Sequence, residues 1–323
     1  MSEQALPQAY YRTGTPRRDV SPDLERILES IVQIRVVATY TTYVYSSEDP
    51  PTIGQLRRTG VIEGAESVRI LDRSRSATAV LVSRSDRRLL FLTAGHAVHV
   101  PDSVADFLDG EGGGLADAPD TRRVRSIAIL RNRENFVVGL PGLEPFRVLV
   151  HDAERDLAFL GMRYPPDEDL TRVRVLSAEP GDSRRLSWGS HVYMLGYPAG
   201  YRMVTQGIVS DPEADLAASF VVDGPGHEGM SGSPIFAVTG DNESLEWVGV
   251  ARAAAVAMEE ALVAEEGTEV HDPWIPYRGP IYLRPVARPH IGITLSRSIR
   301  QVQAFANANR DGLREMGYAP PEF

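Results

Sequence analysis

The sequence has no cysteine and no lysine among its 323 residues. The lack of cysteine excludes disulfide bonds, cysteine-based zinc sites and a cysteine nucleophile. All 34 basic residues are arginines, and with 44 acidic residues the formal charge is −10, which argues against a nucleic-acid-binding protein. No H-E-x-x-H motif is present, so a zincin-type metal site is not expected. The sequence implies no cofactor.

Long hydrophobic runs are also lacking. No segment is apolar over the length that a membrane-spanning helix needs. Residues 1–7 have neither the basic nor the apolar stretch of a secretory signal peptide. The 42% hydrophobic and 24% charged content is typical of a soluble globular protein. We therefore expect a cytoplasmic protein with no membrane partner, long enough for one large or two ordinary domains.

Three residues with complementary chemistry occur in the order His, Asp, Ser. His96 ends the run Leu-Thr-Ala-Gly-His, Asp156 begins the run Asp-Leu-Ala-Phe-Leu, and Ser231 lies within Gly-Met-Ser-Gly-Ser-Pro. A serine hydroxyl is a weak nucleophile until a neighbouring base takes its proton, and a neutral histidine can do so near pH 7. A carboxylate on the other ring nitrogen fixes the histidine tautomer. The sequence therefore predicts a hydrolytic triad.

Each of these residues also has an ordinary structural explanation when it is taken alone. Gly, Ser and Pro dominate turns for local reasons, and a histidine or aspartate can simply satisfy a hydrogen bond or end a strand. His99, Asp152 and Ser233 are alternative candidates nearby, and Asp152 is the strongest of them. An α/β-hydrolase is disfavoured because its nucleophile precedes its histidine in the chain and lies in G-x-S-x-G.

The three motifs resemble the signature blocks of trypsin-like serine proteases and occur in the order of that family. A fourth block, His-Val-Tyr-Met-Leu-Gly-Tyr-Pro-Ala-Gly at 191–200 followed by Val-Thr-Gln-Gly-Ile-Val-Ser at 204–210, is similar to bacterial HtrA-like members. The resemblance covers about residues 76–251 and resumes weakly near 290–302. Four blocks in the family's order are a specific signal, whereas a single block would be a weak one.

The resemblance implies a role for each matched residue. His96 would act as general base and acid, Asp156 would orient it, and Ser231 would attack the substrate. The N–H groups of Gly229 and Ser231 would form the oxyanion hole. Met230 departs from the family's common Asp or Asn before the nucleophile, which argues against activation by a newly cleaved N-terminus.

The same resemblance implies an all-β fold of two Greek-key β-barrels of the trypsin-like type, with the catalytic cleft between them. An N-terminal helical extension and a C-terminal helix would complete it. The predicted divisions are an N-terminal arm and helix at 1–30, a first barrel at 31–165, a second barrel at 166–296 with an insertion at 252–289, and a C-terminal helix and tail at 297–323. We expect no PDZ module after the last segment.

Local patterns predict the individual elements. Ser-Pro-Asp-Leu-Glu favours a helix over 21–30, and residues 31–45 are rich in β-branched and aromatic side chains typical of a strand. We expect a flexible arm over 1–20, a loop over 46–65 and a surface loop over 101–120. The Ala- and Glu-rich start of the insertion, 252–266, favours a helix, and the apolar spacing over 296–316 predicts a C-terminal helix docked on the second barrel. Short strands are predicted at 77–83, 89–93, 126–130, 135–138, 146–151, 157–160, 192–195, 203–210, 217–222, 233–237 and 245–251.

The predicted function is a bacterial serine endopeptidase that cleaves protein or peptide substrates through an acyl-enzyme intermediate. The alternatives are a protease-like scaffold that binds peptides without cleaving them and, less favoured, an esterase. Because a free protease in the cytoplasm is hazardous, we hypothesise narrow specificity or gating by a regulatory protein partner that contacts 1–30 and 252–289. The sequence predicts neither the oligomeric state nor the residue preferred before the scissile bond.

Overall fold

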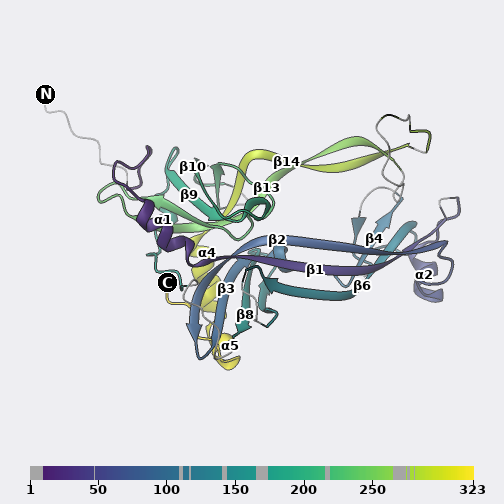
Figure 1. Cartoon of the computed structure of the whole chain (residues 1–323). Helices are drawn as coiled ribbons and strands as arrows, with labels where there is room; N and C mark the ends of the chain where they lie inside the picture. The colour runs from purple at the N-terminus through teal and green to yellow at the C-terminus, as the bar shows by residue number, and fades with distance from the viewer. Residues whose placement is uncertain are drawn as a thin grey trace.

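The computed structural model describes residues 10–46, 48–108, 112–115, 118–139, 144–164, 174–214, 219–264, 274, 277–279 and 281–323. The chain forms two β units (Figure 1). One is an eight-stranded sheet in the order β5-β4-β6-β1-β2-β3-β8-β7, and the other is a closed barrel in the order β10-β11-β14-β13-β12-β9. The predicted all-β architecture with terminal helices is confirmed.

The elements of the first unit run from residue 31 to residue 163. They are β1 (Ile31–Val44), α2 (Ile53–Thr59), β2 (Ser67–Ser85), β3 (Arg88–Ala94), α3 (Gly95–Val98), β4 (Ser103–Phe107), β5 (Gly112–Gly113), β6 (Val124–Val137), β7 (Arg147–Asp152) and β8 (Leu157–Arg163). The predicted boundary between the units, near 165, lies outside the described residues.

The second unit contains two short 3-10 helices and six strands. They are η1 (Ser183–Arg185), β9 (His191–Gly196), η2 (Pro198–Gly200), β10 (Met203–Asp211), β11 (Phe220–Asp223), β12 (Pro234–Val238), β13 (Leu245–Ala264) and β14 (Ile281–Ser298). The helices α1 (Ser21–Leu28), α4 (Ile299–Ala308) and α5 (Arg310–Glu315) flank the two units. No helix in the described part of the chain has the length and apolarity needed to cross a membrane.

The C-terminal helix packs between the units instead of on the second barrel alone. In α4 the residues that follow helical spacing, such as Val302 and Phe305, are buried. The ring of Phe305 stacks on Phe159 of β8 at 4.6 Å, and the same apolar cluster includes Trp247 of β13. The helix therefore closes a core that both β units share.

The N-terminal segment over residues 10–20 is packed, which corrects the prediction of a flexible arm there. Tyr11 is fully buried in the core of the second unit, and its hydroxyl donates to Glu246 Oε2 at 2.8 Å. The backbone N–H of Arg12 donates to the carbonyl of Val238 at 2.8 Å. The apolar body of Tyr11 outweighs the polar composition around it. Residues 1–9 lie outside the described part of the chain.

The predicted loop over 46–65 contains the helix α2. Thr52 accepts a hydrogen bond from the N–H of Gln55, and the Gln55 side chain accepts one from the N–H of Thr52. This reciprocal pair is a capping box, which starts a helix despite the prolines just before it. The predicted surface loop over 101–120 likewise contributes β4 and β5 to the edge of the first sheet.

The helix predicted over 252–266 is wrong for residues 252–264, and residues 265–266 lie outside the described part of the chain. Residues 252–264 continue the strand β13, which pairs antiparallel with β14 as far as Ala264 opposite Ile281. Alanine and glutamate favour helix locally, but pairing along a second long strand overrides that preference. The two strands form an arm that projects from the barrel (Figure 1), and we call residues 252–264 with 281–292 the β13–β14 arm.

Candidate active site

The structure brings the three predicted residues together where the two units meet. His96 lies in α3 directly after β3, Asp156 directly precedes β8, and Ser231 lies between β11 and β12. The Nε2 atom of His96 is 2.9 Å from the Oγ atom of Ser231. Its Nδ1 atom is 2.9 Å and 3.1 Å from the two carboxylate oxygens of Asp156. In the neutral imidazole, Nδ1–H donates to the carboxylate and Nε2 accepts from the serine hydroxyl.

A tight turn fixes Asp156. Its φ of +54° lies in the left-handed region, which aspartate tolerates better than most residues. Its backbone carbonyl accepts from the N–H of Gly95 at 2.9 Å, and its Oδ1 atom accepts from the N–H of His96 at 2.7 Å. The same carboxylate therefore orients both the ring and the main chain of His96.

Arg252 of β13 is a site residue that the sequence did not reveal. Its Nε atom donates to Oδ2 of Asp156 at 2.8 Å, and the Asp156 side chain is only 7% exposed. Burial alone would raise the pKa of Asp156. The hydrogen bonds and charge of His96, together with the hydrogen bond from Arg252, hold that pKa below its ordinary value. Nothing in the sequence distinguishes Arg252 from the other arginines, because only the course of β13 brings it to Asp156.

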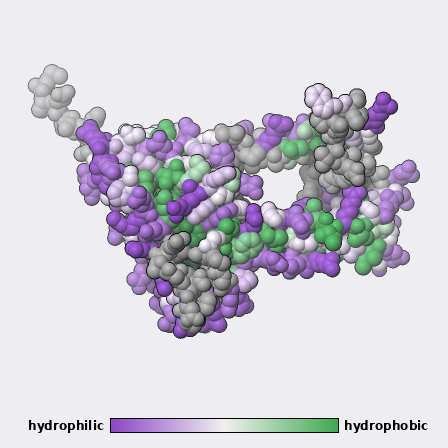
Figure 2. Space-filling model, viewed as in Figure 1, coloured by the Kyte–Doolittle hydropathy of each residue, from purple (hydrophilic) through white to green (hydrophobic). Residues whose placement is uncertain are grey.

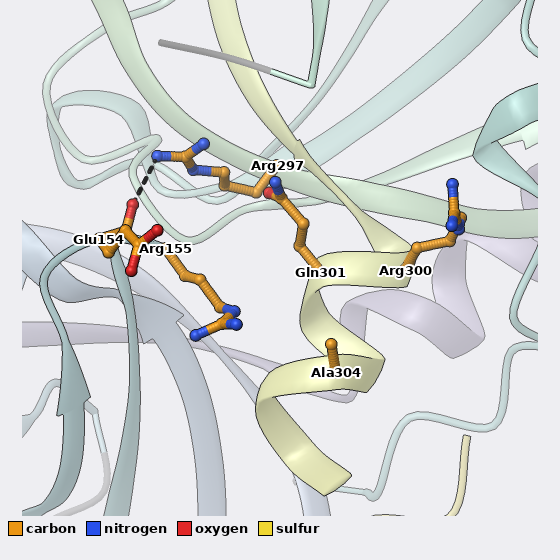
Figure 3. A pocket seen from close by; sticks show the side chains of 6 residues that line it. All are labelled: Glu154, Arg155, Arg297, Arg300, Gln301 and Ala304. Carbon is orange, nitrogen blue, oxygen red and sulfur yellow. Dashed lines mark hydrogen bonds between the residues drawn. The ribbon is translucent and has the colours of Figure 1, made fainter. Parts of the chain in front are cut away.

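A second arginine supports the same turn from β14. The buried Arg297 donates from Nη2 to the carbonyl oxygen of Glu154 at 3.0 Å (Figure 3). Burial, reinforced by the charge of Arg252, lowers the pKa of Arg297 from its ordinary value. A surface pocket of about 350 Å³ opens beside this contact, lined by Glu154, Arg155, Arg297, Arg300, Gln301 and Ala304. Strands β13 and β14 thus each supply one arginine to the segment that carries Asp156.

The turn around Ser231 requires glycine at two positions. Gly229 has a φ of +96° and Gly232 a φ of +89°, values that side chains disfavour. A Cβ atom at Gly229 would lie 2.1 Å from the carbonyl oxygen of Tyr197, and one at Gly232 would lie 2.1 Å from that of Thr78. The Gly-Met-Ser-Gly motif therefore reflects a backbone that passes close to both units.

The peptide group before Gly229 has a defined orientation. The carbonyl oxygen of Glu228 accepts from the N–H of Ala199 at 2.9 Å. This peptide bond is trans, so the N–H of Gly229 points away from Ala199. In the described part of the chain, neither this N–H nor that of Ser231 donates to a backbone carbonyl. The main chain of the described residues therefore leaves both N–H groups without an acceptor.

Thr78 of β2 ties this turn to the first unit. Its fully buried hydroxyl donates to the carbonyl of Gly229 at 2.7 Å and accepts from the N–H of Tyr197 at 3.0 Å. Its backbone N–H donates to the carbonyl of Ser231 at 2.9 Å. One residue from the first unit therefore holds two segments of the second, the turn at 229–231 and the end of β9 at Tyr197. The sequence carries no signal for this role, since threonine is common in strands.

The alternative candidates have other surroundings. His99 is exposed, Asp152 pairs with Arg155 at 2.6 Å, and the buried hydroxyl of Ser233 contacts the sulfur of Met230 at 3.7 Å. The side chain of Met230 itself is buried in the apolar core of the second unit. This packing accounts for an apolar residue before Ser231.

Metal ligands do not cluster in the described part of the chain: no group of three histidine, aspartate or glutamate side chains is placed to hold an ion there. The polar groups around His96 bind one another instead. The prediction that no cofactor takes part stays a prediction.

The chain was also compared with known proteins. The chain is similar to the HtrA-type protease AlgW with a decapeptide, at 15% identity and a TM-score of 0.41 over 94% of this chain and 68% of that one. It is also similar to the Rv3671c protease from M. tuberculosis in its active form, at 15% identity and a TM-score of 0.40 over 100% and 97%. Similarity this low indicates nothing about substrates. No curated protein matches. The family model described as the trypsin-like peptidase domain matches residues 77–243, about half of the sequence, and the chain belongs to that family.

Proposed function

We propose that the protein is a serine endopeptidase in which Asp156, His96 and Ser231 form the catalytic triad. The observation that carries the proposal is the position of the His96 ring, with Ser231 Oγ at 2.9 Å on one nitrogen and the Asp156 carboxylate at 2.9 Å on the other. Nucleophile, base and orienting carboxylate are thus within hydrogen-bond distance.

The first half-reaction acylates the serine. Ser231 Oγ attacks the carbonyl carbon of the scissile bond while His96 Nε2 takes its proton. The Asp156 carboxylate stabilises the imidazolium that forms. The N–H groups of Gly229 and Ser231 stabilise the oxyanion of the tetrahedral intermediate, and His96 then gives the proton to the leaving amine. An ester joins the substrate's acyl group to Ser231.

The second half-reaction releases that group. His96 takes a proton from a water molecule that attacks the ester carbonyl, and the same two N–H groups stabilise the second oxyanion. His96 then returns the proton to Ser231 Oγ. Arg252 acts through Asp156 as a positioning residue.

Labelling with a fluorophosphonate probe, followed by mass spectrometry of the modified peptide, tests the nucleophile. We expect a stable adduct on Ser231 in the wild type and none in Ser231→Ala. The variant Ser233→Ala is a matched control, because its hydroxyl lies two residues away and is fully buried. Labelling that Ser231→Ala leaves intact would contradict the proposal.

Turnover then separates the alternatives. A serine endopeptidase hydrolyses unfolded β-casein at internal peptide bonds, whereas an esterase turns over only simple esters. A protein that the probe does not label and that hydrolyses neither casein nor simple esters, yet binds peptides, would be the non-cleaving scaffold.

The regulatory partner and the cytoplasmic location also stay predictions. Tyr11 and Ile27 are buried, so deletion of residues 1–30 would disturb folding before it removed any partner contact. Affinity capture with the intact chain, and fractionation of the native cells, are the appropriate measurements.

A further inference from the structure

The β13–β14 arm begins at the nucleophile. The strand β12 pairs with β13 only as far as Pro234 opposite Val250. Ala251 then donates to the carbonyl of Ser233 and accepts from the N–H of Gly232, both at 2.8 Å. Beyond Ala251, the described strands give β13 one neighbour, β14. One edge of β13 is therefore open from the residues next to Ser231 outward.

The two edges of the arm differ in their chemistry. Strand β14 contains Pro285 and Pro289, opposite Glu260 and Val256. Proline has no N–H and is confined to strand edges where that position faces outward, so it blocks the outer edge of β14 to a further strand. The arm portion of β13 contains no proline. Only the β13 edge can therefore accept another strand along its length.

One face of the arm is apolar and exposed. Leu262 is opposite Leu283, and Met258 and Ile281 lie an even number of residues from them on the same strands, so all four share a face. The exposed fractions are 65% for Met258, 74% for Leu262, 56% for Ile281 and 61% for Leu283. Such contiguous exposed apolar side chains mark interaction surfaces.

Polar groups have a different distribution on the arm. On the opposite face Arg288 pairs with Glu259 at 3.0 Å, while Glu260 lies on the apolar face between Met258 and Leu262. A two-stranded ribbon is marginally stable in water, and a third strand is the usual remedy. Figure 2 shows an opening between the arm and the long strands of the first sheet. This opening leaves space for another chain beside the arm.

We propose that the arm binds the substrate polypeptide itself, as a third strand added to the open edge of β13. Every strand pair in the described part of both units is antiparallel. A strand antiparallel to β13 runs from the tip of the arm to its base, and its C-terminal end reaches Ser231. The segment on the arm is therefore the one N-terminal to the scissile bond.

This binding mode defines a substrate class. Main-chain hydrogen bonds along β13 select an extended, unfolded segment, and side chains at alternate positions select its sequence. Met258 and Leu262 lie seven and eleven residues beyond Ala251. Paired strands advance together at about 3.3 Å per residue, so the face favours apolar side chains at every second position about seven to eleven residues before the scissile bond. This inference rests on the proposed peptidase function and adds the part of the substrate that is recognised.

Peptides of two lengths test the inference. A site cleaved in β-casein is used to make a short peptide with three residues before the scissile bond and a long one with about eight more of the casein sequence, which is enough to reach Leu262. For the wild type we expect kcat/KM to be about tenfold higher for the long peptide, mostly through KM. N-methylation of single amides in the added segment should lower kcat/KM at every second position, because alternate N–H groups face β13.

Two variants locate the effect. Met258→Ser/Leu262→Ser removes apolar surface from exposed positions, so folding is spared, and should reduce the advantage of the long peptide severalfold. Ile70→Ser on β2 is the matched control, because Ile70 is also 65% exposed but lies outside the arm. It should leave the advantage unchanged. All proteins should cleave the short peptide equally.

The outcomes separate this inference from the proposed function. Equal kcat/KM for the two peptides, or N-methyl effects without a two-residue period, would overturn the arm as a substrate site while leaving the peptidase intact. A dimer in sedimentation that Met258→Ser/Leu262→Ser dissociates would reassign the edge to a second copy and also overturn it. Absence of cleavage of either peptide, with Ser231 unlabelled, would instead refute the peptidase function.

Discussion

The site at the junction and the β13–β14 arm differ in how they are held. Around Ser231, buried polar groups from both units bind one another, and a single hydroxyl, that of Thr78, contacts two segments at once. In the arm, two strands bind each other and leave apolar side chains such as Leu262 in solvent. Fixed geometry suits the reaction, which is the same for every peptide bond. An open strand edge suits recognition, which depends on the sequence of the polypeptide that binds.

The largest effect should come from breaking the fixed turn. Gly229→Ala places a Cβ atom 2.1 Å from a carbonyl oxygen at a φ of +96°, so the peptide that carries one oxyanion donor must move. We expect kcat to fall about 100- to 1000-fold, the usual loss for such a donor. Gly60→Ala is the control, since Gly60 has a φ of +90° but no atom within 4 Å of the added Cβ. Equal activity of Gly229→Ala and wild type would contradict this assignment.

Thr78→Val should come next, and it acts mainly on stability. The substitution leaves the carbonyl of Gly229 and the N–H of Tyr197 buried without their partner, at a cost of about 1–3 kcal/mol each. Urea unfolding measures the loss. Thr42→Val provides the comparison, because the buried Thr42 hydroxyl has no partner in the described structure. We expect Thr42→Val to leave the free energy of unfolding unchanged or to raise it. A similar decrease in that free energy for both variants would refute the role of Thr78.

Arg252→Met should lower kcat about tenfold, equivalent to about 1.4 kcal/mol in the barrier, with little change in KM. The value of kcat should fall because Arg252 orients Asp156. KM should change little because Arg252 does not bind the short substrate. Steady-state kinetics with a short peptide would separate the two constants. Arg288→Met, which removes the arginine of an exposed ion pair on the arm, should leave kcat unchanged. Equal kcat for Arg252→Met and wild type would remove Arg252 from the site.

The pH dependence of stability should report the Asp156 contacts. Because the pKa of Asp156 in the folded protein is below its ordinary value, the carboxylate stabilises the fold at pH values above about 3.9. That contribution is lost as the pH falls below this value and through the lower folded pKa. Unfolding free energies of wild type and Asp156→Asn, measured from about pH 6 to about pH 2, should therefore converge in acid. A constant difference would contradict the prediction.

The smallest expected effect is that of a substitution in the arm on the free energy of unfolding. Leu262→Ser should change the free energy of unfolding by no more than about 0.5 kcal/mol, because the side chain is 74% exposed. By contrast, Leu92→Ala, at a fully buried position of β3, should cost about 2–5 kcal/mol. A large loss in Leu262→Ser would show that the arm is covered in the free protein.

The sequence predicted what depends on short motifs. His96, Asp156 and Ser231 each lie in a local pattern whose chemistry is readable, and the strand-rich pattern with a terminal helix indicated the fold. The need for glycine on both sides of Ser231 could be predicted for the same reason, because these residues form one local turn.

The rest depends on contacts between distant segments. Arg252 reaches Asp156 only because β13 continues past the barrel, and Thr78 reaches Gly229 only because the two units meet there. The helix predicted over 252–266 failed because local alanine content says nothing about a partner strand farther along the chain. Tyr11 was likewise read as part of a polar arm, although its ring is buried in the second unit.

The pairing of the arm bears on how such an enzyme diversifies. Side chains on a ribbon alternate between its faces, so adding or removing two residues from each strand changes its length while every remaining side chain keeps its face. Such changes occur far from Ala251 and leave the hydrogen bonds to the nucleophile's turn untouched. The length of the arm can thus change, in evolution or by design, in small steps that leave the turn around Ser231 intact.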